Sequence, residues 1–139
     1  MERRLVQVTA RFLAHPASLP QLHEAFDQFV LESDAAGAPI ATSDRIAIVT
    51  ASAEVCANII EHACVGLADA WISTLFIRHH DRVEVRFEDP GVRLPATVST
   101  PLGWRSEGGR GLALARASAN VEYVRLDGTN RWRLVRMAP

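Results

Sequence analysis

The pattern of apolar and polar positions predicts a strand followed by two helices in the first half of the chain. Residues 5–14 are apolar with several β-branched side chains, which predicts a strand. Apolar side chains then recur at steps of three and four over residues 19–32, as in an amphipathic helix. A second helix is expected over residues 45–64, with Ser43 or Asp44 as its cap. Its predicted apolar face consists of Ile46, Val49, Ala53, Cys56, Ile60 and Ala63.

The second half of the chain predicts two pairs of strands separated by a long connection. The first pair is joined by a short turn, and the second pair flanks Asp127-Gly128, a strong hairpin signal. Between the pairs, residues 89–109 lack periodicity and are rich in proline and glycine, which is typical of a functional loop such as a lid. A short helix is expected over residues 111–119. The four predicted strands are residues 71–79, 82–88, 121–126 and 131–137. Within residues 82–88 the alternation places Val83, Val85 and Phe87 on one face and Glu84, Arg86 and Glu88 on the other.

This order of elements predicts an α+β fold rather than a doubly wound α/β fold. Strands that follow one another in adjacent pairs favour antiparallel pairing, and the helices can then all cover one face of the sheet. The chain of 139 residues has the size of one domain, so residues 1–139 are expected to form a single two-layer sandwich.

Composition narrows the classes of partner. The formal net charge of −1 gives no electrostatic argument for binding nucleic acid or an anionic membrane. Cys56 and Cys64 lie about 12 Å apart along one predicted helix, at 1.5 Å per residue, which is too far for a disulfide. Free thiols and the absence of a secretory signal at the N-terminus predict a cytoplasmic protein, and no apolar run is long enough to predict a membrane span.

One segment of the second helix carries a carboxylate, a carboxamide and an imidazole. Glu54, Asn58 and His62 are spaced at four-residue steps, which places them near one face of the helix. A carboxamide oxygen is a suitable ligand for Mg²⁺, and a nearby carboxylate can deprotonate a hydroxyl nucleophile. A solvated helix face is the other interpretation of the same spacing, and His62 can equally be a packing residue.

Two further motifs complete a candidate nucleotide pocket. Asp89-Pro90-Gly91 follows a strand, so its carboxylate can accept a hydrogen bond from an exocyclic amine and its glycine can let a ring approach; a plain turn is the alternative. Glycines that open a helix can cradle phosphate on backbone amides, although they also suit a simple helix cap. This third motif and its basic neighbours comprise Arg105, Gly108, Gly109, Arg110, Gly111 and Leu112.

Taken together and in this order, the three motifs resemble those of the GHKL (Bergerat-fold) ATPase superfamily. The resemblance covers roughly residues 45–137. The short chain and the Glu54-x-x-x-Asn58-x-x-x-His62-Ala63 form are similar to bacterial anti-sigma-factor serine/threonine kinases of partner-switching modules. The resemblance implies a mixed, mostly antiparallel sheet covered by helices on one face.

The resemblance also implies a role for each motif. Glu54 would be the general base that activates a hydroxyl on a partner protein, and Asn58 would hold Mg²⁺ against the phosphates of ATP. Asp89 would bind the adenine amine, with Gly91 beneath the ring. The remaining implied nucleotide-binding residues are His62, Arg105, Gly108, Gly109, Arg110, Gly111 and Leu112.

The implied partners are proteins rather than nucleic acids or membranes. The substrate would be a serine or threonine of a STAS-domain anti-anti-sigma protein, and a sigma factor would compete with it; a homodimer is a further option. The alternative function is a non-catalytic module that senses ATP and regulates a partner, and a third option is an interaction domain that binds no nucleotide.

Overall fold

The computed structural model describes residues 3–94 and 118–138, which contain one five-stranded sheet. The strand order is β1-β2-β3-β5-β4, and each neighbouring pair in this described part of the chain is antiparallel. The parallel component of the expected mixed sheet is therefore not seen there. The strands are β1 (Arg4–Leu13), β2 (Trp71–His79), β3 (Arg82–Asp89), β4 (Asn120–Leu126) and β5 (Thr129–Met137).

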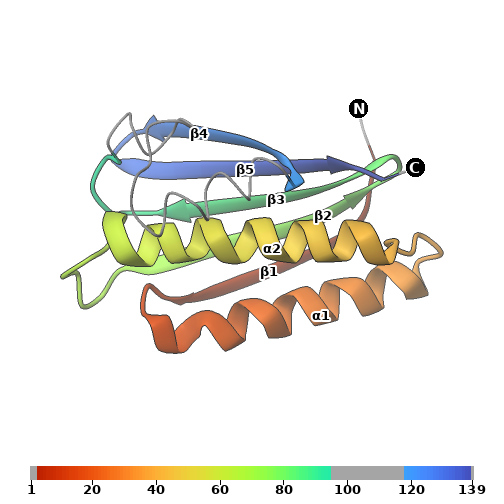
Figure 1. The fold of residues 1–139 in the computed structure, drawn as a ribbon, viewed down its shortest axis with the longest axis horizontal. Helices are drawn as coiled ribbons and strands as arrows, with labels where there is room; N and C mark the ends of the chain where they lie inside the picture. Colours follow the sequence, from red (N-terminus) through yellow and green to blue (C-terminus); the bar gives the residue numbers. More distant parts are fainter. Residues whose placement is uncertain (1–2, 95–117, 139) are drawn as a thin grey trace.

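Two long helices cover the same face of this sheet (Figure 1). A short 3-10 turn, η1 (Pro16–Ser18), leads into α1 (Leu19–Ala35), and α2 (Thr42–Asn58) follows after a short loop. The helix continues beyond α2 as a single π-helical turn, η2 (Ile59–Ala63). The predicted two-layer α+β sandwich is confirmed, while most of the helix expected over residues 111–119 lies outside the described residues.

The hydrophobic core fills the space between the sheet and the helices. Phe29 of α1 stacks on Phe76 of β2 with ring centroids 5.5 Å apart, and Trp132 of β5 is 1% exposed. The alternation predicted for β3 is confirmed, because its valines and Phe87 are buried in this core while its glutamates lie on the other face of the sheet. The core thus fixes which side chains of β3 face the helices and which face away.

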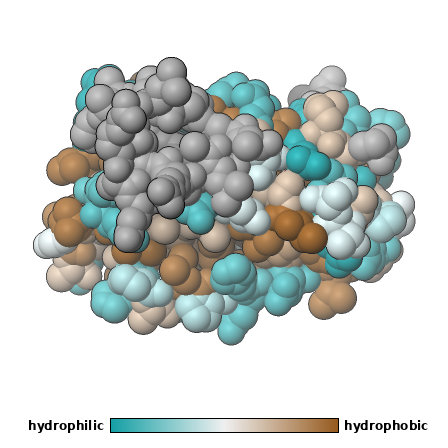
Figure 2. Space-filling model, in the orientation of Figure 1, coloured by the Kyte–Doolittle hydropathy of each residue, from teal (hydrophilic) through white to brown (hydrophobic). Residues whose placement is uncertain are grey.

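The predicted apolar face of α2 is wrong in part. Ile46 is 60% exposed and Val49 is only half-buried, whereas Ile48, Ala51 and Val55 are completely buried against the sheet. The helix is apolar around much of its circumference, so its spacing alone does not select one face. The two outward residues line a groove of about 410 Å³ between α1 and α2, and apolar surface is visible over the helical layer in Figure 2.

The apolar character of this helix also bears on the membrane expectation. Over residues 42–63 the helix is long and apolar enough to pass for a membrane span by length and composition, with a mean hydropathy of 1.3. More than half of its most apolar stretch, 56%, is buried inside the domain. A core helix with this burial pattern gives only weak evidence for a membrane.

The expected cap of α2 is also wrong. The helix begins at Thr42, its cap residue is Ala41, and no side chain makes a capping hydrogen bond. Asp44 lies in the first turn instead and accepts a 2.6 Å hydrogen bond from Nε of Arg136 on β5. Its carboxylate therefore ties the helix to the sheet rather than to its own backbone amides.

The hairpin between β4 and β5 forms as the sequence predicts. Asp127 and Gly128 have φ angles of 51° and 78°, the left-handed pair that a two-residue hairpin turn requires. This turn sets the register of β4 against β5, in which Arg125 pairs with Asn130. On the other side of β5, Asn130 pairs with Asp89 of β3.

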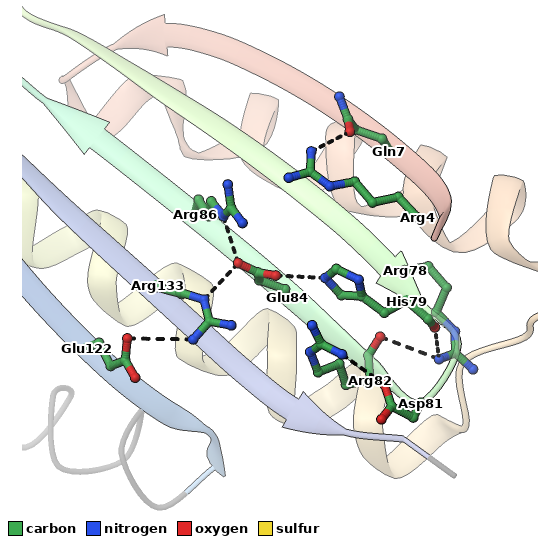
Figure 3. A network of polar contacts seen from close by, with 10 residues as sticks. All are labelled: Arg4, Gln7, Arg78, His79, Asp81, Arg82, Glu84, Arg86, Glu122 and Arg133. Carbon is green, nitrogen blue, oxygen red and sulfur yellow. Dashed lines mark hydrogen bonds and ion pairs between the residues drawn. The ribbon is translucent and has the colours of Figure 1, made fainter. Parts of the chain in front are cut away.

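The sheet face opposite the helices carries a network of charged side chains (Figure 3). Its centre is Glu84 of β3, which is 1% exposed although it faces away from the helices. Its carboxylate accepts hydrogen bonds from Nε of Arg86 at 2.6 Å and Nε of Arg133 at 2.8 Å, and lies 2.7 Å from Nε2 of His79. Burial by itself would raise the pKa of Glu84, but these partners outweigh it and lower the pKa to about 2.

Candidate functional site

The candidate site lies where three elements end at the same side of the domain (Figure 1). The C-terminal end of α2 and η2, the end of β3 and the turn of the β4–β5 hairpin all reach this side. The backbone amide of Val92, just after β3, donates to the carbonyl of Ala63 at 2.8 Å. The fold thereby brings the first two predicted motifs together, although they are far apart in the sequence.

Asn58 is the last residue of α2 and the most unusual polar group of the site. It is 2% exposed, and neither its Oδ1 nor its Nδ2 has a hydrogen-bond partner in the part of the chain that the structure describes. Leaving a buried polar group unpaired costs roughly 1–3 kcal/mol. A π-helical turn follows directly, a distortion often found at functional sites. A ligand that supplies partners for this carboxamide would remove the cost.

Glu54 and His62 flank Asn58 at one helical turn on either side. Both side chains are half-buried, and Nε2 of His62 lies 4.0 Å from the carboxylate of Glu61. Glu54 is therefore partly open to solvent and lies one helical turn before Asn58.

Asp89 is the last residue of β3, and one of its two carboxylate oxygens has no hydrogen-bond partner among the described residues. Its Oδ1 accepts hydrogen bonds from the Gly91 amide at 2.8 Å, from Nδ2 of Asn130 at 3.0 Å and from Sγ of Cys64 at 3.5 Å. Its Oδ2 is buried and has no partner among residues 3–94 and 118–138. Burial raises the pKa of Asp89, and the surrounding hydrogen bonds only partly offset this effect.

Gly91 is required by packing in this structure. A Cβ atom at this position would lie 2.3 Å from the carbonyl oxygen of Ala63 and 2.8 Å from Oδ1 of Asp89. The sequence predicts that this glycine lets a ring approach, which stays a prediction; the contacts show that it admits the backbone of η2. The close approach fixes the turn that holds Asp89.

Cys64 is the thiol that joins η2 to Asp89. Burial and the nearby Asp89 charge raise its pKa to about 12, so it remains protonated and can donate to the carboxylate. Both cysteines are buried and free, which confirms that no disulfide forms between them.

Sequence reasoning missed three residues of the β4–β5 hairpin that belong to this site. Asn130 is 0% exposed and contacts Asp89, while Tyr123 and Arg125 contact Asn130. The sequence did contain a signal. Asn130 lies two residues before Trp132 and four before Leu134 on the same strand, so all three side chains point to the core side of the sheet. A carboxamide in such a position is a buried polar group that needs specific partners.

The third predicted motif cannot be placed. The predicted phosphate-side residues are Arg105, Gly108, Gly109, Arg110, Gly111 and Leu112, and they lie outside the described residues. Their roles remain expectations from the sequence.

Asn58 offers one oxygen of the kind that would fit a magnesium ion held mainly by a nucleotide. No group of three or more His, Cys, Asp or Glu side chains suited to a metal ion occurs in the described ranges. Mg²⁺ usually keeps several waters and takes only one or two protein oxygens beside substrate phosphates. The unpaired Oδ1 of Asn58 is one oxygen of this kind.

The sequence matches a known family over almost its whole length. A model of the histidine kinase-like ATPase domain matches residues 12–138. The chain therefore belongs to this family, and membership implies ATP binding and an activity of the kinase or ATPase type. Among proteins with curated descriptions, none matches the sequence.

Two solved structures support the same fold. The structure of the RsbU and RsbW domains of Rv1364c from Mycobacterium tuberculosis is similar with a TM-score of 0.66 and 18% identity, over 96% of this chain and 33% of that chain. The histidine kinase domain of the blue-light activated histidine kinase from Erythrobacter litoralis EL346 is similar with a TM-score of 0.54 and 19% identity, over 67% of this chain and 44% of that chain. At these identities the likeness establishes the fold. This chain spans less than half of either protein.

Proposed function

We propose that this domain is an ATP-dependent protein serine/threonine kinase that acts as an anti-sigma factor and phosphorylates a STAS-domain anti-anti-sigma protein. The observation that carries the ATP-binding part is the pair of buried, unpaired acceptor oxygens on Asn58 and Asp89. Both atoms lie at the same end of the domain. A bound ligand that supplies a cation for Asn58 and a hydrogen-bond donor for Asp89 explains them best.

Asp89 would recognise the base of the nucleotide. Its unpaired Oδ2 can accept a hydrogen bond from the exocyclic amine of adenine, while Oδ1 stays engaged by protein donors. A carboxylate oxygen facing a keto group would instead place two acceptors against each other. The site would therefore discriminate against guanine and hypoxanthine.

Asn58 and Glu54 would serve the phosphoryl transfer. Mg²⁺ bound with ATP would neutralise phosphate charge, and Oδ1 of Asn58 would hold it. Glu54 would accept the proton of the partner's hydroxyl as that oxygen forms a bond to the γ-phosphorus and ADP leaves. His62 and the unplaced glycine motif, with Arg105 and Arg110, would contribute on the phosphate side.

The partner assignment draws on the solved RsbW domain and on the form of the helical motif. The RsbW domain is similar over almost the whole of this chain. A STAS protein as substrate, a sigma factor as competitor and a cytoplasmic location follow as one hypothesis of a partner-switching module.

Thermal unfolding with and without Mg-ATP, Mg-ADP and Mg-GTP tests the binding part. At 100 times Kd a ligand adds about 2.7 kcal/mol to the free energy of unfolding, and we expect this gain with adenine nucleotides only. Asn58→Ala should lose most of the gain from Mg-ATP but little of the gain from metal-free ATP. The exposed Asn120→Ala is the matched control.

Transfer of labelled γ-phosphate to a purified STAS domain tests the catalytic part. Glu54→Gln should retain Mg-ATP binding and lose at least about 100-fold in transfer rate. Glu61→Gln, an exposed neighbour on the same helical segment, should keep the rate. If the parent protein binds ATP but transfers no phosphate to any STAS partner, the non-catalytic ATP-sensing module replaces the kinase.

A further inference from the structure

Asn130 of β5 is the most completely engaged polar side chain next to the candidate site. It is 0% exposed, and each hydrogen-bonding position of its carboxamide has a partner. Its Nδ2 donates to Oδ1 of Asp89 at 3.0 Å and to the Val92 carbonyl at 2.8 Å. Its Oδ1 accepts from the hydroxyl of Tyr123 and from Nη1 of Arg125.

These partners fix the orientation of the amide. Nη1 of Arg125 can only donate, so the atom that faces it at 3.1 Å must be the amide oxygen. The Tyr123 oxygen accepts from the Leu94 amide at 3.2 Å, which leaves its proton for Asn130. Rotating the amide by half a turn would set its NH₂ group against the arginine. The NH₂ group therefore faces Asp89 in every low-energy arrangement.

The fixed amide of Asn130 makes the two carboxylate oxygens of Asp89 differ in their hydrogen bonding. Oδ1 is held by Asn130, Gly91 and Cys64, from β5, the turn after β3 and the end of η2. Oδ2 is left as the single acceptor of this carboxylate without a partner in the described part of the chain. A carboxylate fastened by one oxygen keeps the other at a fixed place and angle, which is what discrimination between a donor and an acceptor on a base requires.

We propose that Asn130, oriented by Tyr123 and Arg125, is a positioning residue that gives the pocket its selectivity for a 6-amino purine over a 6-oxo purine. The inference rests on the proposed binding of adenine at Asp89 and names a determinant of its specificity. Asn130 acts through Asp89 and does not itself touch the base.

Binding of Mg-ATP and Mg-ITP by isothermal titration calorimetry tests the proposal, because ITP differs from ATP in carrying a 6-oxo group. The parent protein should bind ATP at least about tenfold more tightly than ITP, since a misplaced acceptor leaves buried groups unpaired. Asn130→Ala should weaken ATP binding about tenfold and ITP binding little, which lowers the ratio of the two Kd values. Tyr123→Phe removes only the orienting hydroxyl and should lower the ratio less.

Controls separate positioning from support of the fold. Val124→Ala, on the exposed side of the same hairpin, should leave the ratio unchanged. In an Asp89→Asn background, Asn130→Ala should change the ratio no further, because the residue through which it acts is gone. If Asn130→Ala fails to fold, Tyr123→Phe still decides the question.

Two different failures are distinguishable. An unchanged ratio in folded Asn130→Ala and Tyr123→Phe, with a selective parent protein, would overturn the positioning role alone. Absence of ATP binding by the parent protein would overturn the proposed function and this inference with it.

Discussion

Strand β3 carries two buried carboxylates, Glu84 and Asp89, whose hydrogen-bond partners and pKa shifts are opposite. Each residue is 1% exposed, yet Glu84 faces the sheet surface opposite the helices and Asp89 ends the strand at the candidate site. Glu84 has two arginines and a histidine as partners, and its pKa falls to about 2. Asp89 is held mainly by neutral donors on one oxygen, and its pKa is raised.

The contrast separates a carboxylate that stabilises the fold from one that is prepared for a ligand. A buried carboxylate with hydrogen-bond partners on both oxygens, two of them arginines, is satisfied by the protein alone. A buried charge with one unpaired oxygen is not, and the fold holds it at some cost in stability. The unpaired oxygens of Asn58 and Asp89 therefore indicate a binding site more strongly than their burial itself does.

The largest expected effect comes from removing the charge of Glu84. Glu84→Gln should lower the free energy of unfolding by about 3 kcal/mol, because it leaves three partners around an uncharged buried group. Urea denaturation at pH 7 measures the change. Glu88→Gln lies on the same face of the same strand, where its carboxylate is 49% exposed and 3.9 Å from Arg131, and should cost less than about 0.5 kcal/mol. Equal losses in both variants would contradict the special role of Glu84.

The second expected effect is the pH dependence of this stabilisation. The pKa of Glu84 falls from 4.5 to about 2 on folding, so its contribution is complete above about pH 5 and is lost as the pH falls toward 2. The difference in unfolding free energy between the parent protein and Glu84→Gln should therefore shrink over this range by up to about 3 kcal/mol. Other carboxylates cancel in the difference. A difference that stays constant from pH 6 to pH 3 would exclude an ionised, depressed Glu84.

Asp89 should respond in the opposite direction. Because its pKa is raised on folding, ionised Asp89 weakens the fold at neutral pH, and this penalty disappears as the pH falls through the folded pKa. Asp89→Asn should thus raise the free energy of unfolding at pH 7 by up to about 1 kcal/mol and reduce the added stability from Mg-ATP. Chemical denaturation with and without nucleotide measures both. A clear loss of stability in the variant would show that Asp89 supports the fold as Glu84 does.

The smallest expected effect is that of removing one exposed partner of Glu84. The Arg86 side chain is 46% exposed, so Arg86→Ala should cost less than about 1 kcal/mol in unfolding free energy. Arg133 and His79 remain to hold the carboxylate. The same denaturation assay applies, and a loss as large as that of Glu84→Gln would mean that the network depends on this single arginine.

Local patterns in the sequence predict the elements of this fold well. The alternation in β3 and the turn at Asp127-Gly128 depend on neighbouring residues alone, and both are confirmed. The sequence also identified Asn58 and Asp89 as candidate groups, because a carboxamide on a helix and an acid after a strand have local signatures. Their roles toward ATP and Mg²⁺ stay predictions.

The sequence does not determine what surrounds these groups. Several of these surroundings depend on residues that are far apart in the chain. They include the buried face of α2, the pairing of Asp44 with Arg136 and the partners of Asp89. Asn130 reaches the site only because β5 pairs with β3 in the register that places it opposite Asp89. Local periodicity determined the strands and turns of this protein, whereas only tertiary packing decided which carboxylate would be fully paired and which would keep an oxygen for a ligand.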